Sequence, residues 1–371
     1  MMISTGDSRR STNWLPRAVT WEELVDRMRE PRRTRETVAE YEAMSRDEKA
    51  EAKDIGGFVG GRIHGGNRKS GNITDRQLIS LDADYADMSL WESWKLMIGG
   101  RALMHTTHSH TPQKPRLRFL IPLKRPVTAQ EYEPVARYLA AQMDIEAFDD
   151  TTYEPSRLMY WPSCPKDGEY LFEAMDGPVC DPDAILGMYP DWRDMRYWPH
   201  SSRQEKIIRR MGEKQGDPLT KPGIVGAFNR AYSITEAIGK FLPEVYTPCG
   251  PGRWTYTKGS TVGGGVTYDG DTFLYSHHDT DPVGGRLCNA FDLVRLHLYG
   301  DRDAGHEDSS LSDAPSQLAM KALCAGDEAV RSELAEAIRR DPSEAFDAQD
   351  AGNAGRLERF ADDMTEQGAA K

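Results

Sequence analysis

The feature that most constrains this chain is an apolar run at residues 78–81 that ends on Asp82 and Asp84. The run predicts a strand, and side chains along a strand alternate between its two faces, so the two aspartates share one side. Neighbouring carboxylates repel each other unless a cation lies between them. Magnesium and manganese take carboxylate oxygens as ligands. The pair is therefore either a metal site or two solvated aspartates in a turn.

Composition describes an ordinary soluble protein, because 38% of the 371 residues are hydrophobic and 29% are charged. No run of eighteen apolar residues predicts a membrane span, and the N-terminus lacks the apolar core of a signal peptide. The five cysteines are scattered without a CxxC pair. Their spacing argues against a zinc ribbon and favours reduced thiols in cytoplasm, with no membrane partner.

Charge is distributed unevenly along the chain. The net charge is −12, but residues 301–371 form an acidic, helix-prone tail that carries 17 acidic and 8 basic residues. Residues 101–125, in contrast, hold six lysines and arginines, three histidines and no acidic residue. A basic strip close to an acidic pair suits a polyanion bound together with a metal.

Local signals between residues 78 and 161 predict a regular order of elements. Strands are expected at 78–84, 102–109, 116–123 and 157–161. Capping boxes at Ser89 and Thr128 begin two helices between them, and another at Thr20 begins a helix nearer the N-terminus. The order β-α-β-β-α-β is the split βαβ pattern, so we expect an α+β protein with an RRM-like catalytic core.

Changes in composition divide the rest of the chain. We expect an N-terminal extension packing on the core, a linker, a smaller C-terminal α/β accessory domain and the acidic tail. The five expected segments are 1–77 (extension), 78–182 (core), 183–222 (linker), 223–300 (accessory domain) and 301–371 (tail).

A second acidic pair, Asp149 and Asp150, precedes the last predicted strand. In the split βαβ order this pair, the first pair and the hairpin at 102–123 can meet on one face of the sheet. Three carboxylates from two segments can hold two metal ions for in-line nucleotidyl transfer. The hairpin cations Lys114, Arg116 and Arg118 would then bind phosphates.

Several motifs resemble the primase–polymerases of the archaeo-eukaryotic primase superfamily. More narrowly, they are similar to the phage and mobile-element group related to virulence-associated protein E. The resemblance is carried by DAD at 82–84, TTHSHTPQKPR at 106–116, FDDTT at 148–152 and RLMYWPS at 157–163. It extends more weakly to residue 300.

The resemblance implies a DNA primase or polymerase with an RRM-like core in the cytoplasm of a bacterial host. Its partners would be a single-stranded DNA template, NTPs or dNTPs, and a replicative helicase. Because no GxxxxGK[ST] motif occurs here, the helicase is expected in trans or in a longer protein. The cofactors would be two Mg²⁺ or Mn²⁺ ions.

Carried over by residue, the resemblance makes Asp82, Asp84 and Asp149 the catalytic acids. Asp150 is a competing or additional metal ligand. Many relatives place a histidine where this chain has Arg118, so nucleotide phosphates would be shared among several side chains. These nucleotide-binding candidates are His108, His110, Lys114, Arg116 and Arg118.

We expect further DNA contacts from a basic, glycine-rich stretch and from a later aromatic segment. The candidates are Arg62, Arg68, Arg76, Arg253 and Trp254. Two alternatives remain at this point. One is a rolling-circle replication endonuclease using His108 and His110 on one metal, although Ser109 stands where a bulky apolar residue is usual. The other is a non-catalytic module that binds single-stranded DNA.

Overall fold

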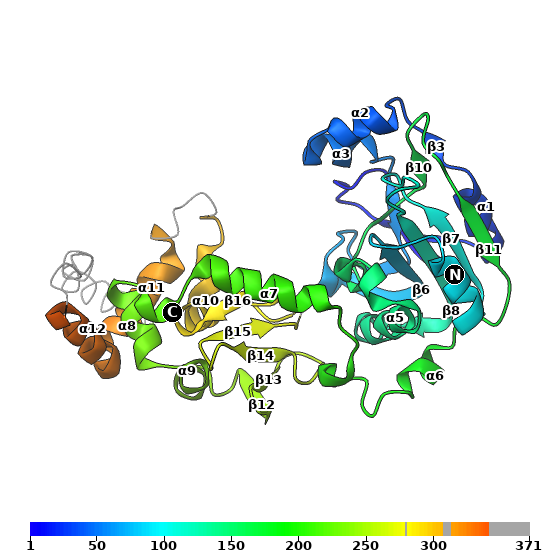
Figure 1. Ribbon diagram of the computed structural model, residues 1–371. Helices are drawn as coiled ribbons and strands as arrows, with labels where there is room; N and C mark the ends of the chain where they lie inside the picture. Colours follow the sequence, from blue (N-terminus) through cyan, green and yellow to red (C-terminus); the bar gives the residue numbers. More distant parts are fainter. Residues whose placement is uncertain (279, 307–312, 341–371) are drawn as a thin grey trace. The chain divides into compact units, whose positions relative to one another are not determined.

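The computed structural model describes residues 1–278, 280–306 and 313–340 (Figure 1). The chain divides into two compact units between Gln204 and Glu205. Parts of the predicted acidic tail, 307–312 and 341–371, lie outside the described residues. Within the described part, no helix is both long and apolar enough to cross a membrane. The five expected segments stay a prediction.

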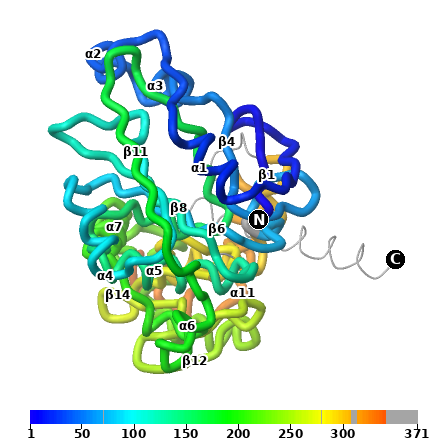
Figure 2. The backbone as a smooth tube through the Cα atoms, turned by 90° about the vertical axis from the view of Figure 1, so that its right-hand side faces the viewer, coloured from blue at the N-terminus to red at the C-terminus, as the bar shows by residue number. Residues whose placement is uncertain are grey.

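A five-stranded antiparallel sheet forms the centre of the first unit (Figures 1 and 2). Its order is β11-β7-β8-β6-β5. The strands are β5 (Gly61–Ile63), β6 (Ile73–Ala83), β7 (Ala102–Thr106), β8 (Leu117–Val127) and β11 (Phe172–Met175). The predicted strands at 78–84, 102–109 and 116–123 therefore exist and lie side by side. The first begins earlier than predicted, at Ile73.

Both faces of this sheet are covered, because its strands are apolar on both sides. Ile79, Leu81 and Ala83 pack under the helices α4 (Leu90–Met97) and α5 (Ala129–Met143). Leu78 points to the other face and packs with residues of α1 (Trp21–Arg29). Because side chains alternate along β6, Asp82 lies on the same face as Leu78.

Two of the three capping boxes form as predicted. Thr20 and Glu23 cap α1 reciprocally, and Thr128 and Glu131 cap α5 in the same way. Ser89 precedes α4, but its side chain makes no capping hydrogen bond. It donates instead to Asp87, which also accepts the Ser89 amide at 2.7 Å. The helix is present without its predicted box.

The last strand of the predicted split βαβ order lies in another sheet. The segment predicted at 157–161 contains β9 (Met159–Tyr160), which pairs with β4 (Gly57–Val59). The outer edge of β6 is occupied by β5, which comes from the N-terminal 77 residues. The structure is thus mixed helix and sheet, but its central sheet departs from the predicted order at the final strand.

The N-terminal residues build the rest of the first unit. A four-stranded sheet has the order β2-β1-β4-β9, and β3 pairs with β10. Figures 1 and 2 show α2 and α3 together at one end of the unit. The remaining bounds are β1 (Met2–Gly6), β2 (Leu15–Ala18), β3 (Arg32–Arg33), α2 (Val38–Ala43), α3 (Arg46–Ala52), β10 (Ser163–Cys164) and α6 (Pro182–Leu186).

The second unit pairs another antiparallel sheet with helices around a core of its own. The segment expected as a linker, 183–222, contains a helix, α7 (Ser202–Gln215), within which the boundary between the units falls. The sheet order is β12-β13-β14-β15-β16. The bounds are α8 (Gly223–Ala231), α9 (Ile234–Phe241), β12 (Tyr246–Gly250), β13 (Arg253–Tyr256), β14 (Gly265–Tyr268), β15 (Phe273–Ser276), β16 (Leu287–Asn289), α10 (Ala290–Tyr299), α11 (Pro315–Gly326) and α12 (Glu328–Arg340).

Candidate active site

A cavity of about 820 Å³ in the first unit brings the predicted acids together. Asp82, Asp84 and Asp149 all line it, although Asp149 is more than sixty residues further along the chain. Lysines and arginines from both the central sheet and the N-terminal residues also line it. The acidic residues are thus surrounded by cationic side chains.

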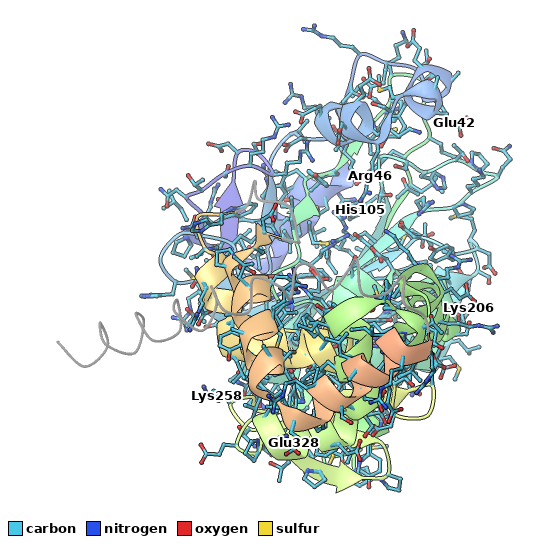
Figure 3. All side chains as sticks on the ribbon, turned by 90° about the vertical axis from the view of Figure 1, so that its left-hand side faces the viewer. Glu42, Arg46, His105, Lys206, Lys258 and Glu328 are labelled. Carbon is cyan, nitrogen blue, oxygen red and sulfur yellow. The ribbon has the colours of Figure 1, made fainter. Side chains whose placement is uncertain are left out.

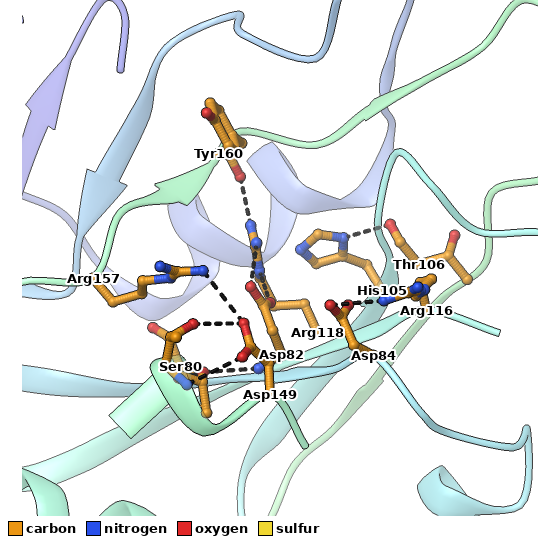
Figure 4. A network of polar contacts seen from close by, with 12 residues as sticks. Ser80, Asp82, Asp84, His105, Thr106, Arg116, Arg118, Asp149, Arg157 and Tyr160 are labelled. Atoms are coloured by element: carbon orange, nitrogen blue, oxygen red, sulfur yellow. Dashed lines mark hydrogen bonds and ion pairs between the residues drawn. The ribbon is translucent and has the colours of Figure 1, made fainter. Parts of the chain in front are cut away.

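Three polar side chains lie in a row across neighbouring strands at the floor of this cavity. Arg118 on β8 is directly opposite Asp82 on β6 on one side and His105 on β7 on the other. Its guanidinium donates from Nε to Asp82 Oδ1 at 2.5 Å and from Nη2 to Oδ2 at 2.9 Å. Nη1 donates to the carbonyl of Tyr160 at 2.8 Å (Figure 4). Arg118 therefore binds the carboxylate in a bidentate manner.

The other two acids also have an arginine each (Figure 4). Arg116 Nη1 lies 2.7 Å from Asp84 Oδ2, and Arg157 Nη2 lies 3.3 Å from Asp149 Oδ2. The backbone fixes Asp149 beside the strand, because its amide donates to the carbonyl of Asp82 at 2.8 Å. The cavity therefore holds three carboxylates, and each is paired with one guanidinium group.

Asp150 points away from this cluster. Its two carboxylate oxygens accept from the hydroxyl of Ser201 at 2.7 and 2.8 Å, and Arg203 Nε lies 3.6 Å away. Asp150 does not line the cavity, whereas Asp149 does. Between the two neighbouring acids, the structure favours Asp149 as the member of the site.

The electrostatics of the row follow from burial and from Arg118. Burial by itself would raise the pKa of Asp82, but the charge and hydrogen bonds of Arg118 outweigh it and hold this pKa below its ordinary value. Burial, with Arg118 nearby, lowers the pKa of His105 to about 4. His105 Nδ1 lies 2.9 Å from the carbonyl of Thr106, which can only accept, so this nitrogen carries the proton. The neutral ring then keeps a lone pair on Nε2.

The model of one protein family, described as the VapE N-terminal domain, matches residues 1–201. The chain belongs to the VapE N-terminal domain family. The match spans the whole central sheet and the three acids. It agrees with the resemblance to proteins related to virulence-associated protein E.

One solved structure with a detectable likeness is the AEP domain of the primase-polymerase of cyanophage S-2L. The two chains share 19% sequence identity over 51% of this chain and 88% of the phage chain, with a TM-score of 0.29. No curated protein matches the chain.

In this VapE N-terminal domain, the two predicted histidines are engaged in other contacts. His108 lines the cavity, but its Nδ1 lies 2.8 Å from Ser163 Oγ and its Nε2 lies 3.0 Å from Glu36 Oε1. His110 is only 3% exposed and is not part of the lining. Its Nδ1 accepts from the amide of Arg116 at 3.2 Å. His110 therefore orders the backbone at Arg116, which corrects the expectation that it contacts phosphate.

The predicted cations of the family domain have different environments. Arg116 and Arg118 line the cavity, and so does Arg68, whose Nη1 donates to the carbonyl of Ser156 at 3.0 Å. Lys114 is exposed and lies outside the lining. Arg62 also lies outside it and donates to Asp75 Oδ2 at 2.6 Å. DNA binding by Arg62 and Arg68 stays a prediction.

The prediction that Arg76 contacts DNA is wrong, because its side chain is fully buried. Its guanidinium donates to three backbone carbonyls and to the hydroxyl of Tyr132, whose ring centroid lies 3.9 Å away. A buried arginine with its donors satisfied stabilises the fold and is not available to DNA. Arg76 lies within β6, which begins at Ile73, five residues before the strand predicted at 78–84.

The remaining two predicted DNA contacts belong to the second unit. Trp254 is 9% exposed and packs in that unit's core. Arg253 Nη1 donates to the carbonyl of Gly263 at 3.0 Å. Burial of Trp254 leaves little ring surface for stacking on a base, which corrects the expectation for this residue.

His105 lines the cavity but is not among the site residues predicted from the sequence. It stands in an apolar segment, ALMHT, where a histidine looks like part of the core. The signal that could have found it is register, since His105 and Asp82 flank the same residue of β8.

The donor set fits a hard divalent cation, since the three acids of the cavity offer carboxylate oxygens. Among the described residues, however, no group of three His, Cys, Asp or Glu side chains is close enough to hold one. Each acid is instead paired with an arginine.

Proposed function

We propose that this chain is a DNA primase–polymerase that transfers nucleotides from NTPs or dNTPs onto a growing strand, directed by a single-stranded DNA template. The observation that carries the proposal is the set of three carboxylates, each paired with its own arginine, in one large cavity. Membership of the VapE N-terminal domain family and the motif resemblance support it. The segment β6–α4–β7–β8–α5 would serve as the RRM-like part of the core.

The arginines give the site a way to select a nucleoside triphosphate. A guanidinium binds phosphate oxygens with the same fork geometry that it uses for a carboxylate. We propose that Arg116 and Arg118 exchange Asp84 and Asp82 for phosphate oxygens of the incoming nucleotide. Asp82 and Asp84 would then be free to hold two Mg²⁺ or Mn²⁺ ions together with Asp149, whose contact with Arg157 is longer, at 3.3 Å. When bound, such ions favour deprotonation of the attacking hydroxyl and neutralise the leaving group.

The reaction is an in-line displacement at phosphorus. The 3′-hydroxyl oxygen attacks the α-phosphorus, the bond from that phosphorus to the β-phosphate oxygen breaks, and pyrophosphate leaves. Arg118 is held by Tyr160 as well as by Asp82, so its guanidinium stays positioned when the carboxylate is released. A helicase in trans, or in a longer protein, and a bacterial cytoplasm as the place of action are part of the proposal.

No observation favours the rolling-circle alternative. Both ring nitrogens of His108 have partners, and His110 is outside the cavity lining. These contacts leave no histidine pair directed to one metal among the described residues.

A single assay separates the candidate functions. The purified chain is incubated with single-stranded template, annealed primer, nucleotides and manganese, in parallel with Asp82→Asn. Primer extension that is lost in the variant supports the proposal. A nick with DNA covalently attached to the protein would establish the endonuclease instead. If DNA binds but neither product forms, the polymerase proposal is overturned and a binding module remains.

A further inference from the structure

One face of α3 is cationic and lines the candidate active-site cavity. Arg46, Lys49 and Ala50, with the C-terminal cap Lys53, are separated by three, four and seven residues, a spacing that places side chains on one side of a helix. All four line the cavity. The acids of the same helix, Asp47, Glu48 and Glu51, are absent from the lining. The charges of α3 are therefore sorted by face.

The acidic side of α3 has its own partners. Glu48 forms the capping box with Ser45, and Glu51 Oε1 lies 2.6 Å from Arg9 Nη2 and 2.5 Å from Arg10 Nη2. Glu48 thus caps the helix, and Glu51 holds the loop that contains Arg9 and Arg10. They do not neutralise the cations on the opposite face.

Four cations of the cavity wall have no carboxylate partner among the described residues. Arg46 makes no side-chain hydrogen bond or ion pair there. Lys49 Nζ donates to the carbonyl of Glu42 at 2.8 Å, and Arg68 Nη1 to that of Ser156 at 3.0 Å. Lys53 lies 5.3 Å from the ring centroid of Tyr160. None of these contacts is an ion pair, although the carboxylates of Asp82 and Asp84 attract Lys53 and that of Glu154 attracts Arg68 from a longer range.

The pKa of Lys53 reflects its burial and the charges on the floor of the cavity. Burial, and then the charge of Arg118, lower the pKa of the Lys53 ammonium, so the wall lies within reach of the floor where Asp82 is bound. Figure 3 labels Arg46 on α3 and His105, which both line the cavity. A cavity with several cations outside ion pairs on one wall favours binding of an anion that can contact several of them at once.

We infer that Arg46, Lys49, Lys53 and Arg68 form a phosphate-binding wall for the backbone of single-stranded nucleic acid. A row of cations along a helix matches successive phosphates better than one compact triphosphate does. The half-buried ring of Tyr160 at the same wall provides a surface on which a base can stack. The inference rests on the proposed function only in identifying the bound strand as the template. It assigns these four residues a direct role in binding nucleic acid, in addition to the packing on the core that was expected of the N-terminal extension.

The test measures binding without catalysis. Fluorescence anisotropy of a labelled oligo(dT) is recorded with the full chain over a range of salt concentrations, without metal or nucleotide. The test variant is Arg46→Gln/Lys53→Gln. The matched control is Arg17→Gln/Arg35→Gln, because both of these arginines are exposed and lie outside the cavity lining. Circular dichroism checks that each variant folds.

The test variant is expected to bind oligo(dT) about tenfold more weakly or worse. The slope of log K against log salt should be shallower by about 1.4 than in the wild type, since each lost phosphate contact on a single strand removes about 0.7 from the slope. The control should keep the wild-type slope. The assay contains neither metal nor nucleotide, so a failure of the catalytic proposal is distinguishable from a failure of this one.

Two results would overturn the inference. Unchanged affinity and slope in the folded test variant would remove the wall as a nucleic-acid site. Normal oligo(dT) binding combined with lost binding of a fluorescent ATP analogue would assign the wall to a nucleoside triphosphate. If the test variant does not fold, Lys49→Gln alone, with about half the change in slope, decides the matter in the same assay.

Discussion

Arg118 and Asp82 form a bidentate ion pair across two neighbouring strands, with contacts of 2.5 and 2.9 Å. The side chains are only 6% and 15% exposed, so solvent screens the pair weakly. A guanidinium in this position supplies positive charge to the carboxylate that a metal ion would bind. Under the proposed function, Arg118 and a divalent cation would compete for Asp82, and an incoming triphosphate would shift that competition by attracting the arginine.

Replacing Arg118 tests this competition. We predict that Arg118→Gln binds Mn²⁺ more tightly than the wild type in the absence of nucleotide, because Asp82 loses its internal counter-charge. The same variant should have little nucleotidyl transfer activity, since a phosphate ligand is gone. Electron paramagnetic resonance of free Mn²⁺ measures the first effect. Arg125→Gln, which breaks a more exposed ion pair, is the control, and equal Mn²⁺ affinity in all three proteins would contradict the competition.

The neighbouring acids Asp149 and Asp150 should respond differently to substitution. We predict that Asp149→Asn reduces the rate of nucleotide incorporation by about a hundredfold or more, in the range seen when a group that stabilises developing charge is removed. Asp150→Asn should change the rate only slightly, because its contacts are with Ser201 and Arg203. Incorporation rates on one primer–template measure both. The reverse order of effects would place Asp150 in the site instead.

Arg76 should matter for stability and not for DNA. Arg76→Met leaves the carbonyls of Gly60, Leu78 and Pro155 without this donor, and we predict a loss of about 3–5 kcal/mol in the free energy of unfolding. Urea denaturation measures the loss. Arg62→Met, which breaks an ion pair at a half-exposed arginine, should cost about 1 kcal/mol or less. Weaker DNA binding by folded Arg76→Met would show that the buried assignment is wrong.

His105 predicts a pH dependence of stability with a definite sign. Its pKa is about 4 in the folded chain against an ordinary value of 6.5, so between these values the unfolded chain binds a proton that the folded chain excludes. The free energy of unfolding should therefore fall as the pH decreases from 6.5 to 4, by about 3 kcal/mol at most from this residue. In His105→Asn this part of the decrease should disappear. A pH series of urea titrations on both proteins makes the comparison, and identical curves would refute it.

Sequence patterns predicted the strand that carries Asp82 because its signals are local. An apolar run followed by DAD predicts a strand whose last side chains share a face, and β6 has this form. Asp149 and Asp150 could not be separated, because both stand at the start of a short 3-10 helix whose orientation depends on Ser201 and on the backbone of Asp82.

Other parts of the site depend on contacts that no local pattern reveals. The strand predicted at 157–161 was expected in the same sheet as β6, but it pairs with β4, and β5 from the N-terminal residues occupies the outer edge of β6. The histidines at 108 and 110 looked available in the sequence, and their partners Glu36 and Glu169 are far away along the chain. The cationic face of α3 was the one local signal that could have been found, from the spacing of Arg46, Lys49 and Lys53.

The most direct test of the central claim is template-directed incorporation of a single nucleotide. A labelled primer on a defined template is incubated with one nucleotide at a time and Mn²⁺, using the wild type, Asp82→Asn and the exposed control Asp87→Asn. We expect the wild type and the control to add only the nucleotide complementary to the template, and Asp82→Asn to add none. Addition that ignores the template, or equal addition by Asp82→Asn, would contradict it.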